Sequence, residues 1–174
     1  MTYKRVIFFG INIDSTEYNN NMKNQVRNIV LSSLFILIVA VLGSVFVNLG
    51  TDWFNSLSRP SQWIPNALIP IVWTVIYIAF AIINYLWIRK GGIPKRIIIL
   101  MIINGVFNVL WCLVFFTLNL LFIGNIVIIL NLIIGYILIY NIFKSEKIYG
   151  HVLSIYPVWL SIATTLNLAL WILN

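Results

Sequence analysis

One feature limits the possible folds of this 174-residue chain more than any other: an uncharged run of 47 residues, from Ile97 to Phe143. A transmembrane helix needs about 20 mostly apolar residues, so a run of this length holds two spans and a turn. The sequence predicts that turn at Thr117–Asn119. Three more uncharged apolar stretches fit one span each, which gives five spans at about residues 28–49, 65–88, 97–116, 120–143 and 150–173.

The composition excludes a water-soluble fold. The chain is 61% hydrophobic and 9% charged, whereas soluble domains are about 45–50% apolar and about 25% charged. Backbone groups in lipid must be hydrogen-bonded within the protein, so continuous apolar runs form helices. We therefore predict an all-α integral membrane protein, a five-transmembrane-helix bundle formed by residues 28–174.

Residues 1–27 precede the first expected span. The segment from Val6 to Ile13 is apolar but too short to cross a membrane, and the Asn-rich segment after it is polar. It lacks the long apolar core and cleavage site of a signal peptide. Two interpretations stay open: a disordered cytoplasmic tail, or a protein whose true start is Met22.

The basic residues predict the orientation in the membrane. With five spans, Arg59 lies on one side, and the other side carries Lys4, Arg5, Lys23, Arg27, Arg89, Lys90, Lys95, Arg96, Lys144 and Lys147. Under the positive-inside rule the N-terminus is cytoplasmic and the C-terminus lies outside. This split explains the basic composition without a nucleic-acid partner. The Asn- and Ile-rich sequence indicates a prokaryotic plasma membrane.

Aromatic and amide side chains share faces on three of the spans. They are Trp73 and Tyr77 on the second, Asn108 and Trp111 on the third, and Trp159, Ala163 and Asn167 on the fifth. One interpretation is interfacial aromatics and interhelical hydrogen bonds. The other is a cavity in which aromatic rings stack on a flat hydrophobic ligand and amides orient it.

Between the first two spans lies a proline-rich loop that carries Trp63. Three prolines, Pro60, Pro65 and Pro70, fall within eleven residues and stiffen it. The loop is either a rigid interfacial turn or a lid over the cavity.

The spans contain no Asp, Glu, Lys or Arg, which argues against ion-coupled transport. One Cys and one His cannot form a metal site alone. We therefore expect no metal and no covalently bound cofactor.

Three segments resemble the TspO/MBR family, which includes the tryptophan-rich sensory proteins and the mitochondrial translocator protein (the peripheral-type benzodiazepine receptor). The resemblance covers about residues 28–174. Its motifs are Pro60-Ser61, Pro65-Asn66 and the run Pro70–Tyr77, then Asn108, Trp111, Phe115 and Phe116, and then the run Tyr156–Asn167.

The resemblance implies a receptor- or sensor-type protein that binds porphyrins such as protoporphyrin IX, or similar flat hydrophobic ligands, within the bundle. Trp73 and Trp159 match tryptophans linked to porphyrin binding and to light-dependent porphyrin breakdown. Tyr77, Asn108 and Ala163 match further pocket positions. Light-dependent porphyrin degradation and transport of tetrapyrroles, lipids or sterols are the alternatives. Homodimers occur in the family, and the oligomeric state stays open.

Overall fold

A computed structural model describes residues 5–8, 11–61 and 64–174. Two short antiparallel strands, in which Arg5 lies opposite Asp14, come first, and helices make up nearly all of the rest. The elements are β1 (Arg5–Phe8), β2 (Ile11–Asp14), α1 (Ser15–Leu49), α2 (Thr51–Ser56), α3 (Leu68–Arg89), α4 (Lys95–Cys112), the π-helix η1 (Leu113–Thr117), α5 (Leu121–Ser145), α6 (Lys147–Leu153) and α7 (Ile155–Leu173).

Five helical segments of the described chain are long and apolar enough to cross a membrane, which confirms the predicted fold class. They cover Tyr18–Leu49, Leu68–Arg89, Lys95–Thr117, Leu121–Ser145 and Lys147–Leu173. Two of these spans are composite, because α4 continues into η1 and α6 continues into α7. Helix α1 begins at Ser15, so it includes residues that the sequence analysis placed before the first span.

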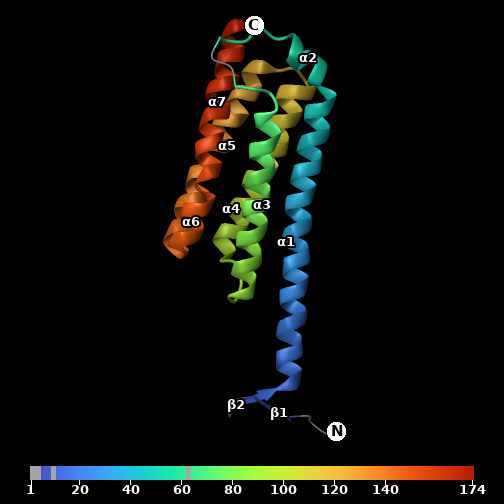
Figure 1. Cartoon of the computed structure of the whole chain (residues 1–174), viewed down its shortest axis with the longest axis vertical. Coiled ribbons are helices and arrows are strands. Elements are labelled where there is room, and N and C mark those ends of the chain that lie inside the picture. The colour runs from blue at the N-terminus through green and yellow to red at the C-terminus, as the bar shows by residue number, and fades with distance from the viewer. Residues whose placement is uncertain (1–4, 9–10, 62–63) are drawn as a thin grey trace.

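The spans pack around one another as a ring. Figure 1 shows the bundle from the side, with α1 extending beyond the other helices. Helix α1 packs on α3 and α4, α4 packs on α5, α5 packs on α7, and α7 returns to α3. The order around the ring therefore differs from the order in the sequence. In the ring, α1 therefore lies between α3 and α4, and α7 lies between α5 and α3.

Two breaks in the helices follow from single residues. Pro157 lies in the first turn of α7, where its ring cannot donate to the carbonyl of Leu153 and crowds it. The helix is interrupted at Ser154, whose hydroxyl donates to the carbonyl of His151 at 2.7 Å. Past η1, Asn119 adopts a positive φ of 58° and the chain reverses into α5. Asn tolerates this left-handed conformation better than most residues.

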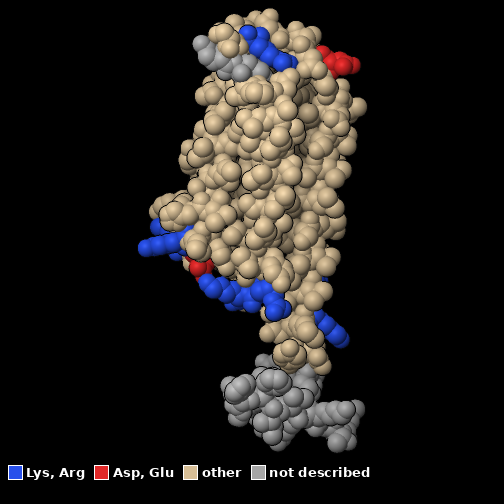
Figure 2. All heavy atoms as spheres, in the orientation of Figure 1, with Lys and Arg blue, Asp and Glu red and all other residues tan. Residues whose placement is uncertain are grey.

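Charged side chains mark the two ends of the bundle (Figure 2). We call one end the basic end, because its described cations are Lys23, Arg27, Arg89, Lys90, Lys95, Arg96, Lys144 and Lys147. We call the other the loop end, because it carries α2 and the loop to α3, with Arg59. At the basic end Lys90 Nζ donates to Glu146 Oε1 at 2.6 Å, and this hydrogen bond raises the pKa of the Lys90 ammonium.

A buried amide pair joins α4 to α5. Asn104 Nδ2 donates to Asn131 Oδ1 at 2.8 Å, and Asn131 is fully buried. We expect Asn131→Leu to lower the free energy of unfolding by about 1 kcal/mol, because interhelical hydrogen bonds in membranes contribute about that much and Asn104 would lose its acceptor. Thermal unfolding in detergent measures the change. A shift no larger than that of Leu130→Ala, a lipid-facing control on the same helix, would contradict this expectation.

Candidate functional site

A cavity of about 530 Å³ opens among α1, α2, α3, α4 and η1 at the loop end. We call it the loop-end cavity. Its size falls in the range of about 300–1,000 Å³ that is usual for small-molecule sites. Its lining comes from α3 (Ile69, Pro70, Trp73, Thr74, Tyr77), from α4 and η1 (Asn108, Trp111, Cys112, Phe116), from α1 (Ala40, Gly43, Ser44, Val47, Asn48) and from α2 and the loops beside it (Thr51, Phe54, Asn55, Asn66).

Aromatic rings form one wall of this cavity. Trp73 and Tyr77 lie four residues apart on α3, so they share a face, and their rings stack with centroids 5.9 Å apart and planes 28° apart. The Trp111 ring of α4 lies 6.3 Å from that of Trp73, inclined by 32°. These three rings form one apolar aromatic cluster on this wall, and aromatic side chains of this kind can stack against a planar ligand.

Small residues of α1 form the facing wall. Ala40, Gly43, Ser44 and Val47 recur at spacings of three and four, so they lie on one helix face. A Cβ atom at Gly43 would lie 3.5 Å from Cys112 Sγ, which shows how closely α1 approaches α4 here. The sequence analysis missed this wall, although the spacing of its small residues was a signal that could have revealed it.

The cavity also holds polar groups that could orient a ligand. Trp111 Nε1 is buried and has no acceptor among the described residues. Because almost none of its surface is accessible, a bound molecule would reach it only after the neighbouring side chains move. Asn108, which is 5% exposed, adds an amide from the same helix. The Thr74 hydroxyl, in contrast, already donates to the carbonyl of Pro70 at 2.8 Å. A ligand with a hydrogen-bond acceptor near Trp111 would satisfy the buried indole N–H.

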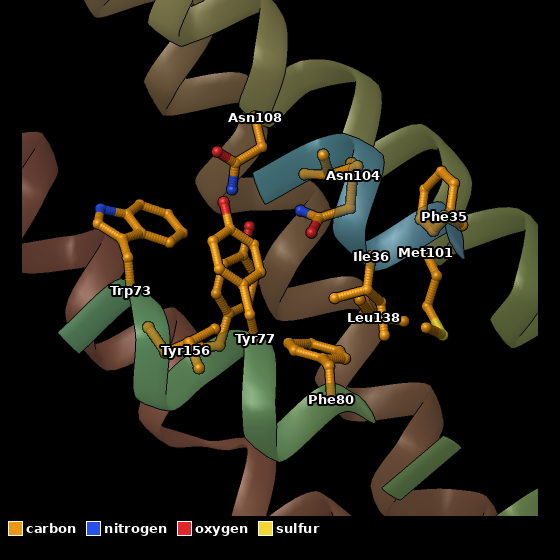
Figure 3. Close-up of a pocket in the computed structure, with 13 residues that line it drawn as sticks. Phe35, Ile36, Trp73, Tyr77, Phe80, Met101, Asn104, Asn108, Leu138 and Tyr156 are labelled. Atoms are coloured by element: carbon orange, nitrogen blue, oxygen red, sulfur yellow. The ribbon is translucent and has the colours of Figure 1, made fainter. Parts of the chain in front are cut away.

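Below these residues lies a small cavity of about 40 Å³ that shares Trp73, Tyr77 and Asn108 with the loop-end cavity (Figure 3). Tyr156 of α7 reaches it, and its buried hydroxyl faces the amides of Asn104, Asn108 and Asn131 without a hydrogen bond of good geometry to any of them. This polar cluster is the floor of the site. It is too small for an organic ligand, so it limits how deeply a planar molecule enters from the loop end.

The segment after α1 covers the loop end. Phe54 of α2 packs on Phe116 with centroids 5.2 Å apart. Arg59 holds the segment together: its Nη2 donates to the carbonyl of Phe54 at 2.9 Å, its Nη1 donates to Asn66 Oδ1 at 3.2 Å, and its guanidinium lies 4.7 Å from the centre of the Phe54 ring. This network fixes α2 against the start of α3.

The end of α7 supports the same segment. Asn174 Oδ1 accepts from the backbone N–H of Ser58 at 2.9 Å, and Asn174 Nδ2 donates to the carbonyl of Ser58 at 3.1 Å and to that of Leu170 at 2.8 Å. One side-chain amide therefore ties the loop to α7. Figure 1 shows the C-terminus beside this loop.

The structure brings four of the eight predicted ligand residues together. Trp73, Tyr77, Asn108 and Trp111 all line the loop-end cavity. The α7 residues Trp159, Ala163 and Asn167 are buried in the helix core and do not line it. Trp63 lies outside the described residues. Within the described part of the chain, no three His, Cys, Asp or Glu side chains gather to hold a metal ion.

The fold and the cavity define a class: a helical membrane protein with an interior, aromatic-lined cavity. The model of the TspO/MBR family matches residues 32–172, so the chain belongs to this family. It is similar to protein CrtK of Rhodobacter capsulatus, with 26% identity over 70% of this chain and 78% of the relative. It is also similar to the tryptophan-rich protein TspO of Archaeoglobus fulgidus, with 27% identity over 86% and 98% of the two chains.

Proposed function

We propose that this TspO/MBR protein binds a flat hydrophobic ligand of the porphyrin class in the loop-end cavity. One observation carries the proposal: a cluster of three aromatic rings, those of Trp73, Tyr77 and Trp111, faces a wall of small residues across a cavity of about 530 Å³. A planar macrocycle matches such a slot, because its faces contact the rings of Trp73 and Trp111 while the small residues of α1 leave room for its edge.

The polar groups support a ligand that carries acceptors. Trp111 Nε1 lacks a partner among the described residues, and the Asn108 amide lies on the same side of α4. A carboxylate or a pyrrole-type nitrogen could accept from the Asn108 amide, and from Trp111 Nε1 once the side chains that bury it move. Because the described lining contains no charged side chain, a carboxylate would be favoured mainly where it reaches Arg59 at the loop end.

The site's place in the membrane is part of the proposal. Eight described cations lie at the basic end, against Arg59 at the loop end, which supports a cytoplasmic basic end and a cavity that opens on the other side. Both relatives come from prokaryotes, which supports the plasma membrane as the location. The same lipid-facing exterior would also accommodate a homodimer.

A protoporphyrin IX titration tests the proposal. We expect saturable quenching of tryptophan fluorescence in the detergent-purified protein, and at least tenfold weaker binding for Gly43→Leu, whose side chain would extend from α1 toward Cys112 and fill the cavity. Val41→Phe, which adds bulk to an exposed side of α1, is the matched control. Absence of saturable quenching, or equal loss in both variants, would contradict the proposal.

Illumination of the same samples tests the enzymatic alternative. The contact between the Trp73 and Tyr77 rings and the nearby Trp111 ring favours it, because oxidisable aromatic side chains would surround the bound pigment. A product that requires light and oxygen, and that is lost in the Trp73→Phe/Trp159→Phe double variant, would establish degradation. Unchanged absorbance under light would leave binding as the function.

A further inference from the structure

A second large cavity, of about 360 Å³, lies at the basic end between α1, α3 and α4. We call it the basic-end cavity. It shares no lining residue with the loop-end cavity. Phe35 and Met101 line both this cavity and the small central one, so their side chains separate the two ends of the bundle. It is therefore a site of its own, and its chemistry can be considered separately.

The interior of the basic-end cavity is suited to a hydrocarbon chain. Its polar groups are partly used within the protein, because Asn84 Nδ2 donates to Ser32 Oγ at 2.8 Å across α3 and α1. Most of the remaining lining is aliphatic, including Ile88, Ile93 and Ile98. An apolar chain would bury its surface here without leaving those two polar side chains unpaired.

The cavity is accessible from the lipid side. Leu31 of α1 is 57% exposed, and Ile98 and Ile102 of α4 are 41% and 46% exposed, although all three line the cavity. These residues face the hydrocarbon region of the bilayer. The opening between α1 and α4 therefore faces lipid, and a chain could enter sideways without crossing the polar headgroup layer.

Cations surround the end of this cavity that faces the membrane surface. Arg27 precedes the lining residue Asn28 on α1, and Arg89 follows Ile88 on α3, where its Nη1 donates to Gln25 Oε1 at 3.4 Å. Lys95 begins α4 three residues before Ile98, so it lies on the same helix face as that lining residue, whereas Arg96 lies on another face. Among the side chains whose exposure is described, the one carboxylate at this end, that of Glu146, already pairs with Lys90. The mouth is thus strongly positive.

From this combination we propose that the basic-end cavity binds one acyl chain of an anionic phospholipid, whose phosphate lies among Arg27, Arg89 and Lys95. The aliphatic interior selects the chain, the lateral opening admits it from the bilayer, and the cations select a negative headgroup over a zwitterionic one. This site is independent of porphyrin binding, because it lies at the opposite end of the bundle.

Native mass spectrometry of the detergent-purified protein tests the site with phosphatidylglycerol and with phosphatidylcholine of the same acyl chains. We expect one saturable phosphatidylglycerol per protein and weaker retention of phosphatidylcholine. Ser32→Phe should lower phosphatidylglycerol affinity at least tenfold, because it fills the cavity. Ser33→Phe is the matched control: the same substitution, one residue on, at an exposed position outside the lining.

Three further variants complete the test. Ile98→Trp fills the cavity from α4 and leaves the Asn84–Ser32 hydrogen bond intact, so it replaces Ser32→Phe if that variant does not fold. Arg89→Gln and Lys95→Gln should each weaken phosphatidylglycerol binding about fivefold and reduce its preference over phosphatidylcholine. Equal retention of the two lipids by the wild type, or equal loss in Ser32→Phe and Ser33→Phe, would overturn the proposal.

Discussion

Trp73→Ala is expected to weaken protoporphyrin IX binding by about 30-fold or more, the loss typical of a central aromatic residue in a binding site. Trp73 lines both the loop-end cavity and the small cavity below it, and its ring lies between those of Tyr77 and Trp111. Its removal takes away one stacking face and lets the neighbouring rings reorient. Fluorescence quenching of the remaining tryptophans measures the change in affinity.

Trp171→Ala is the control for that experiment. Trp171 lies on α7, is 43% exposed and contacts Phe122, so its loss removes an indole from the lipid-facing side. We expect wild-type affinity for this variant. Trp159→Ala adds a second comparison, since Trp159 is buried away from the cavity lining. A larger loss with Trp159→Ala than with Trp73→Ala would move the site toward α7 and contradict the assignment made here.

Gly50→Ala is expected to reduce the free energy of unfolding by about 3 kcal/mol, at the upper end of the cost of overpacking. Gly50 joins α1 to α2, and a Cβ atom there would overlap the backbone carbonyl of Phe116. A backbone atom cannot change rotamer to make room, so α2 and η1 would have to separate. The variant should show a lower melting temperature in detergent and weaker ligand binding, because both segments line the cavity.

Gly43→Ala provides the matched control for this substitution. The added Cβ atom would lie 3.5 Å from Cys112 Sγ and 4.0 Å from Tyr77 Oη, which are ordinary contact distances. We expect a melting temperature close to that of the wild type. Similar destabilisation by the two alanines would show that the close approach of Gly50 to Phe116 does not account for the loss of stability.

The hydrophobic pattern was sufficient to predict the membrane spans. Uncharged runs of about 20 residues have one stable form in lipid, so the five spans followed from length and charge alone. The order of the helices around the ring could not be predicted from this pattern. It depends on which helix faces fit together, and features such as Gly105, where a Cβ atom would lie 2.6 Å from Phe35 Cζ, act only once α1 and α4 meet.

The same limit explains the outcome for the site residues. Helical periodicity correctly grouped Trp73 with Tyr77 and Asn108 with Trp111, and the ring turns both faces toward α1. It grouped Trp159, Ala163 and Asn167 on one face equally well, but α7 packs mainly on α5, away from the cavity. Helical periodicity shows which residues share a helix face. It does not show which helix or cavity that face contacts in the folded protein.

The packing of α1 bears on ligand selectivity. Both large cavities use α1 as a wall, yet Val39 and Gly43 are its buried residues within 18–49, where exposure is described. A helix with few fully buried residues is displaced at lower energetic cost than a helix at the centre of the core. The aromatic wall on α3 and α4 is held in place by the hydrophobic core, whereas the opposite wall, formed by α1, can move. A site with one rigid wall and one movable wall would accept ligands of different thicknesses. It would discriminate between ligands chiefly by how well they stack on the aromatic side chains.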